Sequence, residues 1–232
     1  MNQAINNIYA QRIHQLQAKM KKSDIDACII PTSDPHISEY LPEHWQERRW
    51  ISGFTGSAGT VMVTQNFAGL WTDSRYWEQA QRQLSDTGIS LQKMTTRQNT
   101  HVQWLAENIP PHGTVAVNAA IISVTDKMLL EEVFFSKQIK LVVSENPLAD
   151  LWQDRPALPG NLIYEHQQVF CGLRCTEKIH RIRQKMDELG AHAHIVSALD
   201  DIAWITNLRG NDVDFNPVFL AYLFIDQKQA TL

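Results

Sequence analysis

Residues 60–72 read TVMVTQNFAGLWT. Residues 60–64 alternate in the way that is typical of a half-buried strand, and a short polar connection at residues 65–69 follows them. Leu70-Trp71-Thr72 then predicts the second arm of a β-hairpin. Because a hairpin pairs antiparallel, it makes any larger sheet around it a mixed one.

The segments on both sides of this hairpin alternate between helical and strand patterns. Apolar residues recur at helical spacing from Ile5 to Met20 and are followed by the apolar run 27–30, which predicts a helix that leads into a buried strand. Residues 36–41 and 44–51 also have helix-like composition. The remaining pattern predicts helices at 75–84, 102–109 and 125–135, and strands at 89–94, 115–118 and 139–143. This alternation indicates a three-layer α/β/α domain with a mixed sheet.

A second domain is predicted after residues 155–160, which read RPALPG and have the composition of a linker. We expect a first domain at 1–154, a linker at 155–172 and a second domain at 173–232. In this last part, the elements predicted are helices at 178–189 and 199–208 and strands at 193–197 and 218–225. Their order repeats the opening of the first domain, so we expect an incomplete second copy. So short a segment cannot bury a comparable core, and either the chain is cut or a partner covers the gap.

Composition and charge exclude several function classes. The formal net charge is -4 and the isoelectric point is near 6.1, which gives no electrostatic reason to expect nucleic acid or an anionic membrane as a partner. Residues 1–20 lack the apolar core of a secretory signal, and no later run approaches membrane-spanning length. A cytoplasmic location is therefore expected.

Several candidate site residues have simpler structural interpretations. His192 and His194 are two residues apart, a spacing that can ligate zinc, yet no nearby residues complete a ligand set. Asp200 fits the first turn of a helix capped at residue 197 or 198, where its negative charge offsets the helix dipole. The glycine-rich residues 53–59 lack the Lys-Ser/Thr ending of a phosphate loop and are expected to form a tight structural turn. The three cysteines, which are Cys28, Cys171 and Cys175, are expected to be structural thiols. We predict no catalytic residue and no metal site in the chain.

Several motifs, in order and at matching spacing, resemble the long, three-domain aminopeptidase P enzymes. They read SEY at 38–40, ISGFTGSAGT at 51–60, WTDSRY at 71–76, ALDDIAW at 198–204, NLRGND at 207–212 and NPVF at 216–219. The resemblance spans nearly the whole chain. It implies two creatinase N-terminal-like domains, each with a ribonuclease H-like motif.

The resemblance also implies a function. Members of this family hydrolyse the bond between an N-terminal residue and a following proline, using two divalent ions, usually manganese, in a C-terminal domain whose ligands have no equivalents here. The chain alone is therefore expected to be inactive. Within the whole enzyme, which is expected to be a homodimer that acts on proline-containing peptides, it would shape the substrate cleft and the subunit contacts. The alternative is a stand-alone binding or regulatory protein derived from the same two domains.

Within the WTDSRY motif, the resemblance implies that Arg75 reaches the peptide-binding cleft, and a guanidinium suits this because it offers a rigid fork of donors. The structural alternative is a helix-start arginine paired with Asp73 or Glu78. The family often has Asp where Thr55 stands and Gly where Ser74 stands. Ser74 could therefore change the turn that aims Arg75.

Overall fold

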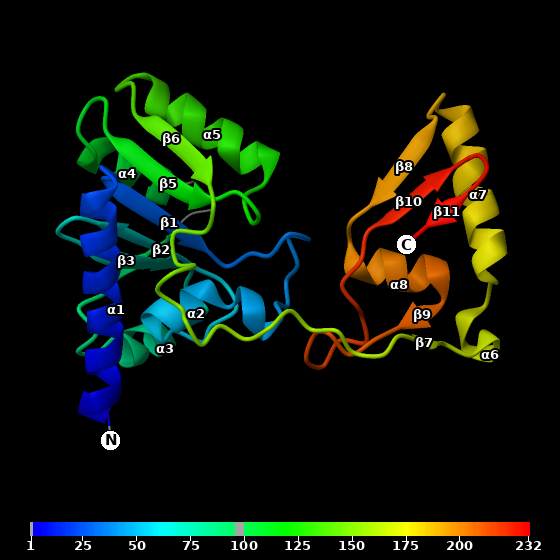
Figure 1. Ribbon diagram of the computed structural model, residues 1–232, viewed down its shortest axis with the longest axis horizontal. Helices are drawn as coiled ribbons and strands as arrows, with labels where there is room; N and C mark the ends of the chain where they lie inside the picture. Colours follow the sequence, from blue (N-terminus) through cyan, green and yellow to red (C-terminus); the bar gives the residue numbers. More distant parts are fainter. Residues whose placement is uncertain (1, 96–99) are drawn as a thin grey trace. The chain divides into compact units, whose positions relative to one another are not determined.

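The computed structural model describes residues 2–95 and 100–232 (Figure 1). The chain divides into two compact units. The first unit comprises Met1–Pro35 and Trp45–Arg155, and the second comprises His36–His44 and Pro156–Leu232. Residues 36–44, which lie between the first strand and the glycine-rich loop in sequence, thus belong with the second unit.

The first unit is built on a six-stranded mixed sheet with the strand order β4-β3-β2-β1-β5-β6 (Figure 1). β1 pairs antiparallel with β2 and β2 antiparallel with β3, whereas the other three pairings are parallel. The predicted hairpin is therefore the source of the mixed topology. The elements up to the end of this sheet are α1 (Asn2–Lys22), β1 (Ala27–Pro31), the 3-10 helix η1 (Glu43–Trp45), α2 (Glu47–Ser52), β2 (Thr60–Thr64), β3 (Ala68–Thr72), α3 (Trp77–Gln83), β4 (Ser90–Lys93), α4 (Thr100–Asn108), β5 (Thr114–Asn118), α5 (Val124–Phe135) and β6 (Lys140–Ser144).

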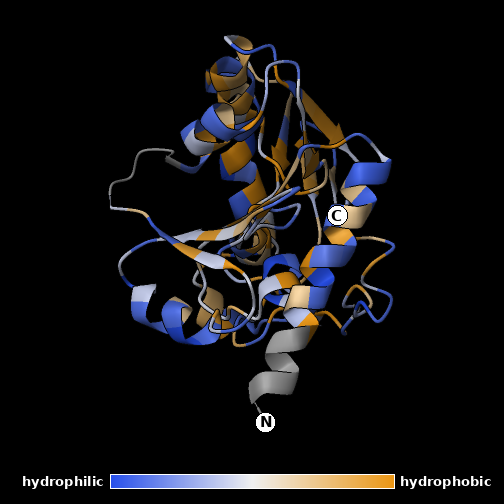
Figure 2. Ribbon diagram, turned by 90° about the vertical axis from the view of Figure 1, so that its left-hand side faces the viewer, coloured by the Kyte–Doolittle hydropathy of each residue, from blue (hydrophilic) through white to orange (hydrophobic). Residues whose placement is uncertain are grey.

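Helices cover both faces of this sheet, as the sequence predicted. On one face, Leu16 of α1, Ile51 of α2 and Ala80 of α3 are buried against alternate strand residues such as Ile30. On the other face, α4 and α5 form a second core over the intervening residues, such as Ile29. Figure 2 shows the apolar strands between these helices. The first unit is a three-layer α/β/α domain.

The second unit has a smaller sheet with the strand order β11-β10-β8, and both pairings are antiparallel. A separate two-stranded ladder joins β7 to β9. Sequence patterns did not predict that ladder, because two-residue strands carry no recognisable period. The elements of this unit are β7 (Tyr164–Glu165), α6 (Gln168–Cys171), α7 (Cys175–Glu188), β8 (Ala193–Val196), α8 (Leu199–Thr206), β9 (Leu208–Arg209), β10 (Leu223–Asp226) and β11 (Ala230–Thr231).

The pairing registers show that the second unit repeats the start of the first. Ala27 pairs with Thr64 at the end of the β1-β2 ladder, and Ala193 pairs with Asp226 at the same place in the β8-β10 ladder. The following hairpins correspond as well, because three residues lie between Thr64 and Ala68 and three lie between Asp226 and Ala230. The predicted second copy is confirmed.

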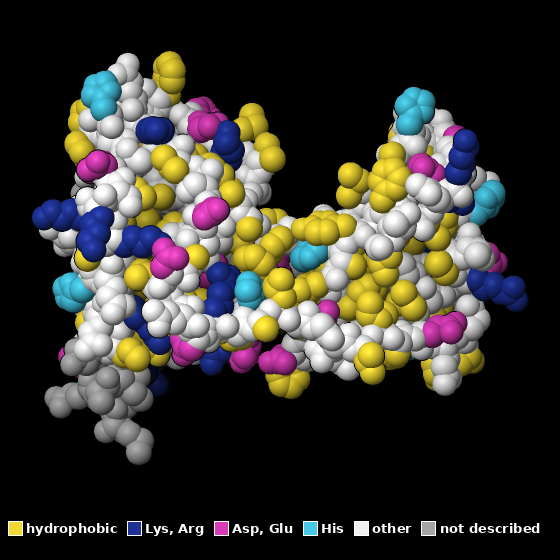
Figure 3. All heavy atoms as spheres, viewed as in Figure 1, with side chains coloured by type: hydrophobic (Ala, Val, Ile, Leu, Met, Phe, Trp, Pro, Cys, Tyr) yellow, Lys and Arg dark blue, Asp and Glu magenta, His cyan; other side chains and the backbone are white. Residues whose placement is uncertain are grey.

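The second copy is incomplete: within residues 2–95 and 100–232, helices cover one face of its sheet and leave the other exposed. Val196, Leu223 and Ile225 are buried beside α7 and α8. On the opposite face, Ile195 is 68% exposed and Phe224 is 36% exposed, whereas Ile29 and Met62 at the corresponding places of the first unit are buried. Figure 3 shows the exposed hydrophobic side chains in yellow.

The helix expected at residues 36–41 is wrong. Ile37 has a φ of 55°, which a right-handed helix excludes, and Pro42 disfavours helix at the residue before it. The His36 ring stacks on Tyr222, with 4.6 Å between ring centroids, and its Nδ1 is hydrogen-bonded to the Ser197 carbonyl oxygen at 2.9 Å. These tertiary contacts within the second unit override the local helix preference.

The strand expected at residues 218–225 forms only in its second half, as β10. Residues before it bind the preceding loop instead: Asp212 N–H donates to the Val218 carbonyl oxygen at 3.1 Å, and Leu220 N–H donates to Asp212 Oδ2 at 2.9 Å. The backbone of this stretch is therefore hydrogen-bonded to a loop rather than to β8.

Candidate substrate-contact site around Arg75

Arg75 lies in the short turn that leads from β3 into α3. Asp73 organises this turn, because its Oδ1 accepts a hydrogen bond from Arg75 N–H at 3.0 Å and its carbonyl oxygen accepts one from Tyr76 N–H at 3.1 Å. The Trp77 indole Nε1 donates to the Thr72 carbonyl oxygen at 3.0 Å, which fixes the start of α3 against the end of β3. Arg75 is therefore carried by a well-braced turn.

The Arg75 side chain forms a bidentate ion pair with Asp73. Its Nε donates to Asp73 Oδ1 and its Nη2 donates to Asp73 Oδ2, both at 2.9 Å. The hydrogen bond from Arg75 holds the pKa of Asp73 below its usual range. The Arg75 side chain remains 66% exposed, and its guanidinium carbon lies 5.1 Å from the centroid of the Tyr76 ring. The pairing with Asp73 is present, and the peptide contact stays a prediction.

The glycine-rich loop at residues 53–59 packs against this turn. Ser57 Oγ and Tyr76 Oη are hydrogen-bonded at 2.6 Å, and the Phe54 and Tyr76 rings meet edge to face with 6.0 Å between centroids. A Cβ at Gly56 would lie 2.7 Å from Tyr76 Cδ1 and closer still to the Phe54 ring. Only glycine fits at position 56 without displacing these rings.

Both departures from the family motif are accommodated by the local structure of this chain. Thr55 Oγ1 accepts hydrogen bonds from Gln79 Nε2 at 2.9 Å and Gln83 Nε2 at 2.8 Å, so α3 holds the loop through a threonine hydroxyl. The non-glycine residues with positive φ in the described part of the chain do not include Ser74. The turn that carries Arg75 therefore does not require the conformational freedom of a glycine at position 74.

The same end of the sheet contains a buried carboxylate that sequence reasoning missed. Glu47 Oε1 accepts hydrogen bonds from Asn118 Nδ2 at 3.3 Å, Asn146 Nδ2 at 2.6 Å and Arg155 Nη2 at 2.9 Å. Burial raises the pKa of Glu47, an effect that Arg155 and the two amides oppose. This network ties α2 to the ends of β5 and β6. Its members are far apart in sequence, so no local pattern indicates it.

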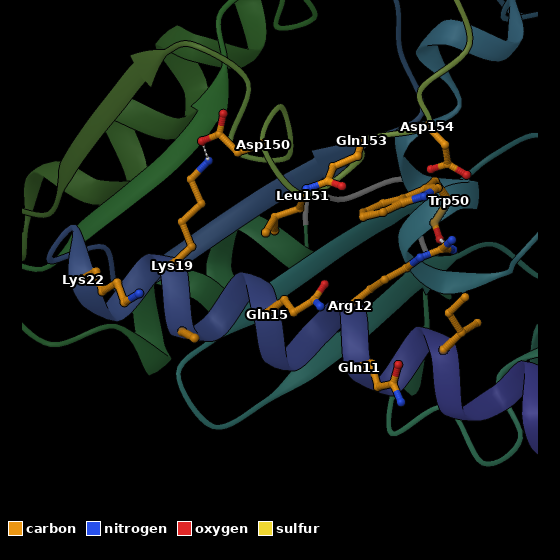
Figure 4. Close-up of a pocket in the computed structure, with 12 residues that line it drawn as sticks. Gln11, Arg12, Gln15, Lys19, Lys22, Trp50, Asp150, Leu151, Gln153 and Asp154 are labelled. Carbon is orange, nitrogen blue, oxygen red and sulfur yellow. Dashed lines mark hydrogen bonds and ion pairs between the residues drawn. The ribbon is translucent and has the colours of Figure 1, made fainter.

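An open groove of about 790 Å³ runs beside α1 in the first unit (Figure 4). On its wall, the Arg12 guanidinium carbon lies 4.3 Å from the centroid of a Trp50 ring, and Arg12 Nη1 donates to the Trp50 carbonyl oxygen at 2.5 Å. Lys19 Nζ pairs with Asp150 Oδ2 at 2.9 Å. These contacts attach α1 to α2 and to the segment after β6, and the lining of the groove carries both positive and negative side chains.

The other polar candidates lie apart from Arg75 in sequence and act locally. His192 and His194 are exposed. Asp200 lies in the first turn of α8. The N-cap residue of this helix is Ala198, which is one of the two positions that the sequence predicted. Burial raises the pKa of the Cys28 thiol to about 12. Across residues 2–95 and 100–232, no group of three or more His, Cys, Asp or Glu side chains could hold a metal ion, so the described residues do not fit a dinuclear metal centre.

No helix within the described residues is long and apolar enough to cross a membrane.

Comparisons with known proteins agree with this architecture. The creatinase/prolidase N-terminal domain family matches the chain twice, at residues 12–151 and again at residues 154–232. The chain therefore belongs to the creatinase/prolidase N-terminal domain family. Its two domains correspond to the N-terminal third of Xaa-Pro aminopeptidases P.

The relatives are longer than this chain. Aminopeptidase P2 of Arabidopsis thaliana is 39% identical over 211 residues, which are 90% of this chain and 30% of the relative. The Xaa-Pro aminopeptidase ApepP of Drosophila melanogaster is 37% identical over 226 residues, which are 95% of this chain and 37% of the relative. The chain thus spans about a third of the length of these relatives.

Among solved structures, the X-prolyl aminopeptidase of Caenorhabditis elegans superposes with a TM-score of 0.87 at 27% identity. The match covers 97% of this chain and 38% of that one. The worm protein is described as a cytosolic enzyme with a di-nuclear active site.

Proposed function

We propose that this chain is the non-catalytic N-terminal portion of an Xaa-Pro aminopeptidase, an enzyme that removes an N-terminal residue preceding proline. The observation that carries the proposal is the match to the worm X-prolyl aminopeptidase over 97% of this chain at a TM-score of 0.87. The described residues lack a group of side chains that fits a metal centre, which supports a division of labour between this portion and a separate catalytic portion.

In this proposal, Arg75 contacts the peptide substrate across the cleft. The bidentate pair with Asp73 uses the Nε and Nη2 donors, and it fixes the plane of the guanidinium before a ligand arrives. A guanidinium carries its N–H donors in a rigid planar fork, so fixing the plane gives the whole group a defined orientation. Such an arrangement suits a carbonyl or carboxylate oxygen of a peptide.

The rest of the proposed enzyme follows from the same relationship. The catalytic portion would supply two divalent metal ions, manganese being our expectation, and the assembled protein would be a cytoplasmic homodimer. This portion would shape the entrance to the substrate cleft and contribute to subunit contacts. None of its described residues takes part in the metal chemistry.

A stand-alone binding or regulatory protein is the alternative. The uncovered sheet face that bears Ile195 and Phe224 is the observation that favours it, because a soluble domain rarely leaves such a face without a partner. The molecular mass of the native gene product separates the two functions. A product of this chain's 26.6 kDa favours the alternative, and one about three times larger favours the enzyme.

The role of Arg75 is tested by Arg75→Ala in the full gene product, with an Xaa-Pro tripeptide as substrate. Because hydrogen bonds to charged groups contribute about 1.5–3 kcal/mol, we expect kcat/KM to fall roughly tenfold to a hundredfold. Arg49→Ala is the matched control, since Arg49 is also an exposed arginine of the first unit. An unchanged kcat/KM in Arg75→Ala would exclude the peptide contact.

A further inference from the structure

Arg48 of α2 is a buried cation whose hydrogen bonds go to backbone carbonyls. It is 3% exposed. Its Nη1 donates to the Phe54 carbonyl oxygen at 3.1 Å and its Nη2 donates to the Gly56 carbonyl oxygen. Its guanidinium carbon lies 4.8 Å from the centroid of the Phe54 ring. One side chain thus holds the glycine-rich loop at two successive points.

This arrangement is unusual for a buried charge. The neighbouring carboxylate of Glu47 accepts its hydrogen bonds from Asn118, Asn146 and Arg155. Arg48 Nε is buried and has no hydrogen-bond partner among the described residues. Burial accordingly lowers the pKa of Arg48 to about 10. A buried charge without a counter-ion destabilises a fold. The role of Arg48 is therefore sought in the loop whose two carbonyl groups it binds.

The loop that Arg48 holds is the loop that supports the Arg75 turn. The Phe54 ring packs edge to face on Tyr76, and the backbone at Gly56 lies against the same ring. Ser57, the next residue, is hydrogen-bonded to the Tyr76 hydroxyl at 2.6 Å. The Tyr76 ring in turn lies beneath the Arg75 guanidinium at 5.1 Å. The contacts therefore run without a gap from Arg48 through the loop and Tyr76 to Arg75.

We infer that Arg48 is a positioning residue for Arg75, acting through the Phe54–Ser57 segment and the Tyr76 ring. Arg48 itself does not touch substrate. The geometric part of this inference stands on the contacts within the first unit, and its consequence for peptide hydrolysis rests on the proposed function. Removal of Arg48 loosens the loop, tilts Tyr76 and broadens the orientations of the Arg75 guanidinium.

The geometric part is tested in the 232-residue chain by NMR of the arginine Nε–H groups. The Arg75 signal is assigned by its loss in Arg75→Lys. In Arg48→Met, we expect the Arg75 Nε–H to shift and its hydrogen exchange to accelerate roughly threefold to tenfold, as a net weakening of one hydrogen bond would cause. Arg49→Met removes the adjacent, exposed charge and should leave the signal unchanged. An unaltered Arg75 signal in folded Arg48→Met overturns the inference.

Arg48→Lys provides the second variant if Arg48→Met does not fold. Lysine keeps the buried charge and can reach one carbonyl, but it cannot replace the fork that binds two. The same displacement of the Arg75 signal is expected in smaller degree. A folded Arg48→Lys chain with an unaltered Arg75 signal overturns the inference equally.

The consequence for function is tested by a double-mutant cycle in the full gene product. If Arg48 acts through Arg75, Arg48→Met lowers kcat/KM, and adding it to Arg75→Ala causes no further loss. Independent, multiplicative losses overturn the route through Arg75. An unchanged kcat/KM in Arg75→Ala overturns the proposed peptide contact of Arg75 alone, because the NMR result for Arg48 does not depend on activity.

Discussion

The buried Glu47 network gives a quantitative prediction about the first unit. In Glu47→Ala, the donors of Asn118, Asn146 and Arg155 lose their shared acceptor, Oε1. Removing one partner of a buried ion pair typically costs about 3–5 kcal/mol. For a chain of this size, that corresponds to a fall in Tm of roughly 6–20 °C. Glu47→Gln keeps an amide Oε1 with two lone pairs that can still accept hydrogen bonds from these donors, so we expect it to cost less than Glu47→Ala.

The pH dependence separates charge from hydrogen bonding at this position. Burial raises the pKa of Glu47 in the folded state. The folded protein therefore binds the Glu47 proton more tightly than the unfolded chain does. This stabilising contribution is complete below the unfolded pKa and is lost as pH rises through the folded pKa. Glu47→Gln does not titrate. Its stability relative to the wild type should consequently improve as the pH rises from about 4, the unfolded pKa of Glu, towards neutrality.

Tryptophan fluorescence in urea is a suitable assay, because six of the seven tryptophans lie in the first unit and only Trp204 lies in the second. The free energy of unfolding is measured for both variants between acidic and neutral pH. Equal losses in Glu47→Gln and Glu47→Ala at neutral pH would refute the assignment of Oε1 as the shared acceptor. A difference between Glu47→Gln and the wild type that is independent of pH would refute the raised pKa.

Three further predictions concern other sites. Asp73→Asn removes the charged partner of Arg75, so in the full gene product we expect a higher KM for an Xaa-Pro tripeptide with little change in Tm; an unchanged KM would contradict the orienting role of Asp73. Lys178→Met leaves the carbonyl oxygen of Trp204 without its buried donor and should destabilise the second unit by about 1–3 kcal/mol, measured by hydrogen exchange of the backbone amides of α7 and α8, and equal stability would count against it. The Cys28 thiol, with its pKa raised to about 12, should resist iodoacetamide at pH 8 until the protein is unfolded, and labelling at Cys28 itself in the native chain, located by peptide mass mapping, would show that it is accessible.

Much of the first unit could be predicted from local patterns. The strand alternation at residues 60–64 and the polar connection after it are short-range features, and they determine β2, β3 and the mixed character of the sheet. The repeated order of elements likewise predicted the second copy, because helix and strand periods are properties of adjacent residues. These features need no knowledge of tertiary contacts.

The site could be predicted only in part, because its supporting residues depend on distant contacts. The motif drew attention to Arg75, but nothing in the composition of residues 44–51 indicates that Glu47 and Arg48 are both buried. Charged residues are almost never buried without partners. The partners of Glu47 come from strand ends and a loop far along the chain, and those of Arg48 are backbone carbonyls of the next loop, which no side-chain pattern indicates. The course of residues 36–44 was missed for the same reason, since ring stacking on Tyr222 determines it.

The central claim is that this chain is the non-catalytic front portion of an Xaa-Pro aminopeptidase. The most direct measurement is hydrolysis of an Xaa-Pro tripeptide with added manganese, comparing the 232-residue chain with the full gene product. We expect activity in the full product and none in this chain. Hydrolysis by the 232-residue chain alone would contradict it and would place a catalytic site among the residues described above.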